Sequence, residues 1–155
     1  MSYNPKLKAV VTQNIDGLHQ AAGSKRVLKL HGNWTRLECT GCGARSTIDD
    51  FDEARAGRVP HCPSCSAVVR PDIVFYGEAL DPATLEGAVL AIAGADMLIV
   101  GGTSLAVYPA AGLIDYYQGG RLVLMNATPT PYDGRADLII REPIGRVFAQ
   151  IQGHV

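Results

Sequence analysis

Four cysteines arranged as two Cys-x-x-Cys pairs constrain this chain more than any other feature of its sequence. Nineteen residues, 43–61, separate the pairs, and this arrangement is typical of a zinc ion held in a tetrahedron of thiolates. The predicted ligands are Cys39, Cys42, Cys62 and Cys65. Four thiolates leave no coordination position for water or substrate, so the sequence predicts a structural zinc site. Two disulfides or a redox-active pair are the alternatives that the spacing leaves open.

The composition excludes several classes of protein. The chain has 155 residues, of which 47% are hydrophobic, so we expect one domain with a small insert. Its net charge is −1 and no basic run is longer than Lys25-Arg26, so direct binding to nucleic acid is not expected. No apolar stretch approaches the ~20 residues of a membrane span, and residues 1–6 contain no apolar signal core. The default expectation is a cytoplasmic protein.

Apolar runs and helical patterns alternate along the chain. We expect strands in the apolar runs 9–11, 27–30, 97–100, 122–126 and 138–140. We expect helices over 15–22, after Asp81-Pro82, from Pro109 and along the stripe 144–151, with a short acidic helix ending at Ala56. Residues 68–78 indicate an extended segment broken at Pro71. This order predicts an α/β fold with a parallel sheet covered by helices.

Polar residues follow the first two predicted strands at the point where each strand ends. Gln13, Asn14 and Asp16 come directly after the first strand, and His31 comes after the second. Open α/β sheets bind ligands at the carboxyl ends of their strands, and a histidine there can accept a proton from a substrate hydroxyl. An ordinary Asn-x-Asp-Gly turn and a structural histidine are the alternatives.

Residues 12–19 (Thr-Gln-Asn-Ile-Asp-Gly-Leu-His), followed by Leu30-His31-Gly32, resemble the core signature of the sirtuins, the NAD-dependent protein-lysine deacylases. The similarity extends from about Lys8 to Ile151. It implies a Rossmann-like parallel sheet formed by residues 1–33 and 71–155, with a zinc-ribbon module inserted at 34–70. The implied cofactors are NAD and zinc, and the four cysteines match the zinc ligands of the family.

The same resemblance assigns roles to individual residues. It implies that His31 is the general base and that Asn14 acts with it in catalysis. Asp16 would hold the nicotinamide amide, and Gln13 and Asn14 would contact the adjoining ribose. The full set of implied NAD-binding residues is Gln13, Asn14, Ile15, Asp16, Gly102, Thr103, Ser104, Asn126, Ala127, Thr128 and Ile144. Core packing is the alternative for Ile144, because it shares a helical stripe with Val147 and Phe148.

The implied substrate is an acyl-lysine protein or peptide. Its acyl group would pass to ADP-ribose, releasing nicotinamide and the free lysine. The resemblance places the peptide on an extended segment formed by Val74, Phe75, Tyr76 and Gly77. Core packing is the alternative for the two aromatic residues.

One departure from the family pattern limits these expectations. Sirtuins begin with a strand, a Gly-Ala-Gly turn and a mobile cofactor-binding loop, and no Gly-Ala-Gly occurs in this sequence. We therefore expect this chain alone to bind NAD weakly, to be nearly inactive, and to self-associate through an uncovered sheet face. The alternatives are a non-catalytic zinc-ribbon module that binds peptide, a protein ADP-ribosyltransferase, and a zinc ribbon that binds nucleic acid.

Overall fold

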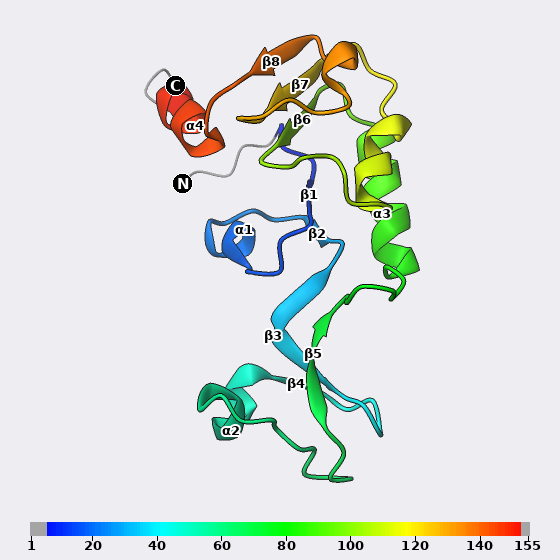
Figure 1. The fold of residues 1–155 in the computed structure, drawn as a ribbon, viewed down its shortest axis with the longest axis vertical. Helices are drawn as coiled ribbons and strands as arrows, with labels where there is room; N and C mark the ends of the chain where they lie inside the picture. The colour runs from blue at the N-terminus through cyan, green and yellow to red at the C-terminus, as the bar shows by residue number, and fades with distance from the viewer. Residues whose placement is uncertain (1–5, 153–155) are drawn as a thin grey trace. The chain divides into compact units, whose positions relative to one another are not determined.

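The computed structural model describes residues 6–152; residues 1–5 and 153–155, at the ends of the predicted Rossmann-like domain, lie outside the described part. The chain divides into two compact units, one up to Leu85 and the other from Glu86 onwards (Figure 1). The predicted domain bounds, 1–33 with 71–155 and a module at 34–70, remain a prediction. Each unit is described by itself below.

The first unit begins with a small parallel sheet. Strand β1 (Val10–Thr12) pairs with β2 (Val27–Lys29), as the two apolar runs predict. Helix α1 (Leu18–Ala21) lies between them in the chain and is shorter than the predicted helix over 15–22. That prediction is wrong at the helix start. Gly17 adopts a φ of +76°, and the Asp16 carboxylate accepts a hydrogen bond from the Leu18 N–H at 2.9 Å, so the chain turns before the helix begins.

An antiparallel sheet follows, with strand order β4-β3-β5. It is formed by β3 (Gly32–Cys39), β4 (Arg45–Thr47) and β5 (Val69–Ile73). The predicted break at Pro71 is wrong, because β5 continues through it. The irregularity lies in the partner strand: the register of β3 shifts between Asn33 and Leu37, opposite the proline that has no N–H to donate.

The predicted acidic helix is interrupted. A 3₁₀ turn, η1 (Ile48–Asp50), precedes helix α2 (Asp52–Arg55). The Asp50 carboxylate accepts a hydrogen bond from the Thr47 N–H at 2.7 Å and caps η1. Asp49 and Asp50 therefore lie at the end of η1, whereas the sequence predicted that they begin one longer helix. Phe51, between the two elements, is buried in the core of this sheet, which consists of Leu37, Cys39, Phe51, Cys62 and Val69.

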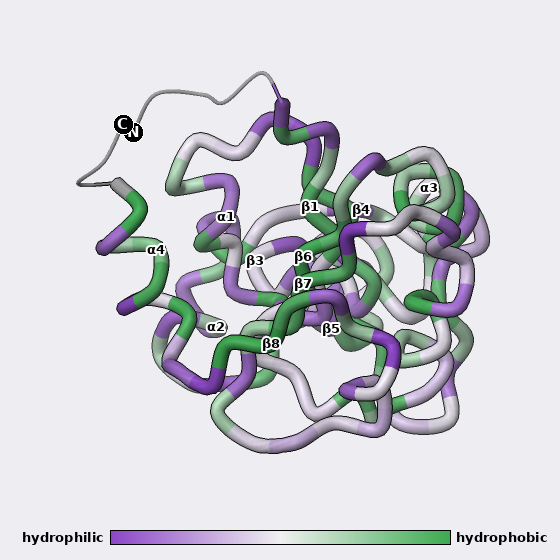
Figure 2. The backbone as a smooth tube through the Cα atoms, turned by 90° about the horizontal axis from the view of Figure 1, so that it is seen from above, coloured by the Kyte–Doolittle hydropathy of each residue, from purple (hydrophilic) through white to green (hydrophobic). Residues whose placement is uncertain are grey.

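The second unit contains a parallel sheet with strand order β6-β7-β8. Its strands are β6 (Leu98–Gly101), β7 (Leu122–Met125) and β8 (Leu138–Ile140), close to the three predicted apolar runs. All four residues of β7 are buried, as expected for a central strand, and the strands are mostly hydrophobic in Figure 2.

Helical segments precede, join and follow these strands. Helix α3 (Pro82–Ala93) is capped by Asp81, whose carboxylate accepts the Thr84 N–H at 2.7 Å, and this helix crosses the division between the units. The others are the 3₁₀ segments η2 (Ala110–Tyr116) and η3 (Asp133–Arg135) and helix α4 (Ile144–Gln152). Within residues 6–152, no helix has both the length and the apolar character that crossing a membrane requires.

Candidate functional site

The four cysteines converge on one point. Their sulfur atoms all lie within 4.8 Å of one another, with Cys39 and Cys65 3.4 Å apart and Cys42 and Cys62 3.7 Å apart. A zinc tetrahedron with bonds of about 2.3 Å has edges of about 3.8 Å, whereas a disulfide requires about 2.0 Å. All four are free thiols in this structure, so the geometry fits zinc and does not fit two disulfides.

The backbone of the first Cys-x-x-Cys pair prepares this site. The N–H groups of Cys42 and Gly41 donate to the Cys39 sulfur at 3.5 and 3.4 Å, and these bonds lower the pKa of that thiol to about 6. A Cβ on Gly41 would lie 2.7 Å from that of Ala67 and 3.3 Å from the Cys65 sulfur. Glycine is therefore required where the two pairs meet, and the thiolate that a metal needs is favoured before the metal arrives.

A second set of predicted residues gathers where β1, β2 and β5 end. The ends of β1 and β2 are joined by the Leu30 N–H, which donates to the Thr12 carbonyl at 2.9 Å. His31 follows immediately and is half-buried. Its carbonyl accepts the Val74 N–H at 3.1 Å, which joins it to the end of β5. The predicted base and the start of the predicted peptide segment are thus adjacent in the structure.

One hydrogen bond determines which nitrogen of His31 is basic. Its Nδ1 lies 3.1 Å from the Gln13 carbonyl oxygen. A carbonyl only accepts, so Nδ1 carries the proton of the neutral ring and Nε2 has the lone pair. This arrangement orients the imidazole and leaves Nε2 as the atom able to accept a proton.

The polar residues after β1 form a tight turn beside this histidine. The Asn14 N–H bonds the Thr12 hydroxyl at 3.0 Å, and the Trp34 N–H bonds the Ile15 carbonyl at 3.4 Å. Asn14 and Asp16 are exposed, whereas Gln13 and Ile15 are half-buried. The Asx turn expected as the alternative is present at Asp16, where the Leu18 N–H donates to Oδ1. This bond does not involve Oδ2, the second oxygen of the Asp16 carboxylate.

The segment after β5 projects its aromatic side chains outwards. Phe75 is 48% exposed and Tyr76 is fully exposed, so core packing is the wrong explanation for both. Val74 is half-buried and Gly77 is exposed with a φ of +86°. The residues predicted to bind a peptide are therefore available on the surface of the first unit.

In the second unit, the turn after β6 is open. Gly102 has a φ of +66°, with nothing within 4 Å of the position of an added Cβ. Thr103 is half-buried and its hydroxyl accepts the Leu105 N–H at 3.2 Å, while Ser104 is exposed. The Ile144 side chain covers the neighbouring Gly101, where a Cβ would lie 2.4 Å from its Cδ1. Ile144 is nonetheless 38% exposed, so it packs on β6 and also presents an apolar surface.

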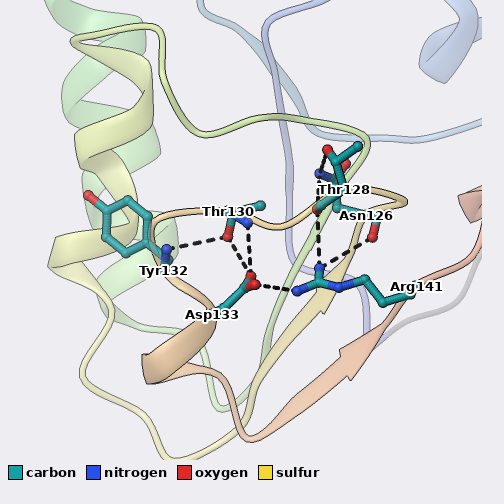
Figure 3. Close-up of polar contacts among 6 residues, drawn as sticks. All are labelled: Asn126, Thr128, Thr130, Tyr132, Asp133 and Arg141. Atoms are coloured by element: carbon teal, nitrogen blue, oxygen red, sulfur yellow. Dashed lines mark hydrogen bonds and ion pairs between the residues drawn. The ribbon is translucent and has the colours of Figure 1, made fainter.

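The loop after β7 is held by a polar network that the sequence did not reveal (Figure 3). The Asn126 amide nitrogen donates to the Thr128 carbonyl at 2.9 Å and to its hydroxyl at 3.2 Å. Arg141 donates to the carbonyls of Asn126 and Thr128 at 3.4 and 3.2 Å and forms an ion pair with Asp133. The Asp133 carboxylate also accepts a hydrogen bond from the Thr130 hydroxyl at 2.8 Å. Ala127 and Thr128 are exposed.

Comparison with known proteins identifies the family. A sequence model described as "Sir2 family" matches residues 1–109. The chain belongs to the Sir2 family. It is 50% identical over 146 residues to an "NAD-dependent protein deacetylase" of Clostridium acetobutylicum, and 51% identical over 147 residues to one of Clostridium perfringens. Each match covers 94% of this chain and 59% of the relative, so the chain spans about three fifths of those proteins.

Solved Sir2 structures match the fold as well. A Sir2 complex with a p53 peptide and NAD+ aligns with a TM-score of 0.87 and 40% identity, over 95% of this chain and 62% of that one. Sir2 bound to an acetylated peptide aligns with a TM-score of 0.88 and 39% identity, over 95% and 63%. These matches confirm the predicted fold class, α/β with a partial Rossmann-like parallel sheet and a zinc-ribbon module.

Proposed function

We propose that this Sir2 chain forms part of an NAD-dependent deacylase that removes acetyl or other acyl groups from protein lysine, giving nicotinamide and O-acyl-ADP-ribose. The observation that carries the proposal is the 3.1 Å contact between His31 Nδ1 and the Gln13 carbonyl oxygen, from which the tautomer of His31 follows. A base oriented in this way, beside an exposed peptide-binding segment, suits proton transfer from a hydroxyl. The names of the relatives, which are NAD-dependent protein deacetylases, support the same reaction.

When bound, NAD would supply the ADP-ribosyl group that accepts the acyl group. The Nε2 of His31 accepts a proton from a ribose hydroxyl in this proposal. Asp16 binds the nicotinamide amide, Gln13 and Asn14 bind the neighbouring ribose, and Ile15 is a further NAD-binding residue. Zinc would be held by the four thiolates and would supply structural cross-linking of the two Cys-x-x-Cys pairs.

The remaining residues proposed to bind NAD belong to the second unit, which is considered by itself. The Gly102 N–H donates to the Met125 carbonyl at 3.1 Å, so the groups that this turn offers are the hydroxyls of Thr103 and Ser104 beside an uncovered glycine, which suits a phosphate or a ribose. The amide nitrogen of Asn126 already donates to Thr128, so its Oδ1 is the atom that would accept a hydrogen bond from a ribose hydroxyl. Ile144 would contribute apolar contact to the adenine, with Ala127 beside the ribose.

The acyl-lysine peptide would bind the segment Val74–Gly77. The segment is a turn and not the extended strand expected from the sequence: β5 ends at Ile73, and the N–H and carbonyl of Phe75 are both bonded to Glu78. Main-chain hydrogen bonds to a peptide would therefore come from the other backbone groups of the segment, while side chains fill neighbouring pockets. The exposure of Phe75 and Tyr76 supports this role.

The test measures nicotinamide release and acetyl loss from an acetyl-lysine peptide in the presence of NAD. It uses this chain alone and this chain joined to the part of the C. acetobutylicum relative that the match does not cover. We expect weak NAD binding by the chain alone and turnover by the joined protein. His31→Ala should lower kcat of the joined protein by roughly 10²-fold or more with unchanged zinc content. His61→Ala, a change at an exposed histidine, is the matched control.

Two other outcomes would replace this proposal. Peptide binding that needs neither NAD nor His31 indicates a non-catalytic zinc-ribbon module. Transfer of labelled ADP-ribose from NAD to protein, without acetyl loss, indicates an ADP-ribosyltransferase.

Location and self-association are also proposals. Four free thiols spaced for a metal suit the reducing cytoplasm. Ile99 on β6 and Leu138 on β8 are exposed, which supports association through the uncovered sheet face. Sedimentation of the zinc-loaded chain would measure it.

A further inference from the structure

A bidentate ion pair closes the segment after β5. Arg70 donates from Nη1 to one carboxylate oxygen of Glu78 at 2.7 Å and from Nη2 to the other at 2.8 Å. Both side chains are little more than a third exposed, at 38% and 39%. Parallel N–H···O bonds of this kind fix the orientation of both groups, which a single contact between flexible side chains does not.

The same two side chains also bond the backbone between them. Arg70 Nη2 donates to the Ile73 carbonyl at 3.0 Å, and Glu78 accepts the Phe75 N–H at 3.0 Å. The Glu78 N–H donates to the Phe75 carbonyl, also at 3.0 Å. These contacts, together with the φ of +86° at Gly77, close a tight loop whose tip is Tyr76.

The guanidinium of Arg70 further covers an aromatic ring. Its Cζ lies 4.7 Å from the centroid of the Phe75 ring, within the range of a cation–π contact. Phe75 is thus held although almost half of its surface is exposed. An exposed aromatic side chain with a fixed rotamer presents a defined surface to a ligand at little entropic cost.

The loop is connected to the base through one residue. Val74, between the Arg70-bonded Ile73 carbonyl and the Glu78-bonded Phe75 N–H, donates its own N–H to the His31 carbonyl. The hydrogen bond from Arg70 and that from the Phe75 N–H lower the pKa of Glu78 to about 2. The pair therefore stays charged at every pH at which an enzyme would be assayed.

We propose that Arg70 and Glu78 are positioning residues that hold the segment Val74–Gly77 in the closed conformation that presents Phe75 and Tyr76 to an acyl-lysine peptide. This inference rests on the proposed function, because it assigns the role of preparing the peptide site to residues outside that site. An isolated exposed ion pair adds little to stability, so the value of this pair lies in the order that it gives to the loop.

The experiment compares Arg70→Lys and Glu78→Gln with Arg36→Lys. Lysine cannot form the paired bonds, and the amide removes the charge while keeping the size of the side chain. Arg36 is the matched control, because it pairs with Asp72 on the same sheet at 2.8 Å. The Kd of the zinc-loaded chain for a fluorescent acetyl-lysine peptide is measured, together with zinc content, the urea midpoint, and hydrogen exchange at the Phe75 and Glu78 amides.

We expect both variants to raise the peptide Kd roughly tenfold and to speed exchange at the two amides, with zinc content unchanged and only a small fall in the urea midpoint. Arg36→Lys should alter neither. Should Glu78→Gln unfold the chain, Arg70→Lys decides the matter. Peptide binding unchanged in the variants overturns this inference and leaves the proposed function standing. A wild-type chain that fails to bind the peptide overturns this inference and the proposed peptide site together.

Discussion

Gly32, the residue after His31, provides the sharpest test of the packing described above. It has a φ of +80°, and a Cβ there would lie 2.1 Å from the Asp72 carbonyl oxygen and 3.0 Å from the Ile73 Cα. Ordinary contacts at such a position begin at 3.4 Å, so Gly32→Ala requires β3 and β5 to separate by more than 1 Å. No flexible side chain can absorb this displacement, because the obstructing atoms are backbone.

The cost has two parts. An alanine held in the left-handed region costs about 1–2 kcal/mol. Separation of the strands also disturbs the pairing of Gly32 with Ile73 and the bond between Val74 and the His31 carbonyl, at about 1 kcal/mol for each hydrogen bond. We expect a total loss of about 3–4 kcal/mol in the free energy of unfolding, which corresponds to a fall of roughly 10 °C in Tm.

Gly23→Ala is the matched control. Gly23 has a φ of +89°, and a Cβ would meet nothing within 4 Å, so this variant bears the conformational cost alone, about 1–2 kcal/mol. Urea unfolding followed by circular dichroism, with zinc content measured in parallel, gives both values. Equal losses in the two variants would refute the reasoning, because the contact with β5 would then contribute nothing.

Three further predictions concern the metal, the loop after β7 and the closed loop after β5. Cys62→Ser, at a buried ligand position, should abolish zinc binding and lower Tm by roughly 10 °C, measured by metal analysis and calorimetry; an unchanged Tm in the metal-free variant contradicts it. Arg141→Ala should raise the Kd for ADP-ribose about 5–20-fold, the loss of about 1–2 kcal/mol, by calorimetric titration, whereas Arg146→Ala on the exposed face of α4 should not. The pKa of Glu78 is lowered to about 2, so its contribution to stability is fully present above about pH 4.5 and is lost as the pH falls towards 2. The protection of the Phe75 amide against exchange, relative to an unstructured amide at the same pH, should fall over that range, and constant protection would count against the bond.

The sequence predicted the elements that depend on local pattern. The apolar run 138–140 is β8 itself, and Asp81-Pro82 marks the start of α3, because an N-cap and a proline act within one turn. The cysteine spacing predicted a shared metal site because each Cys-x-x-Cys pair is itself a local pattern that turns two thiols towards one point. The position of His31 at a strand end followed from the apolar run before it.

Features that depend on particular side-chain bonds or on contacts across the chain were not predictable. The helix expected over 15–22 begins three residues late, because the Asp16 carboxylate accepts the Leu18 N–H and competes with helical backbone bonds. Pro71 was expected to break its strand, but the partner strand absorbs the irregularity. Arg141 and Asp133 are eight residues apart in sequence, on either side of β8, and no periodicity indicates that they form an ion pair.

Strand β3 links two parts of the first unit that differ in chemistry. It starts at Gly32, next to the histidine, and ends at Cys39, the first zinc ligand, and it pairs with β5 near both ends. At about 3.3 Å per residue, its eight residues place the metal roughly 25 Å along the chain from the proposed base. A chelator that slows the reaction would therefore act by removing the zinc site that holds the Cys39 end of β3 in place. Inhibition by metal removal in this chain would be evidence about strand alignment, and it should not be taken as evidence for a zinc-bound nucleophile.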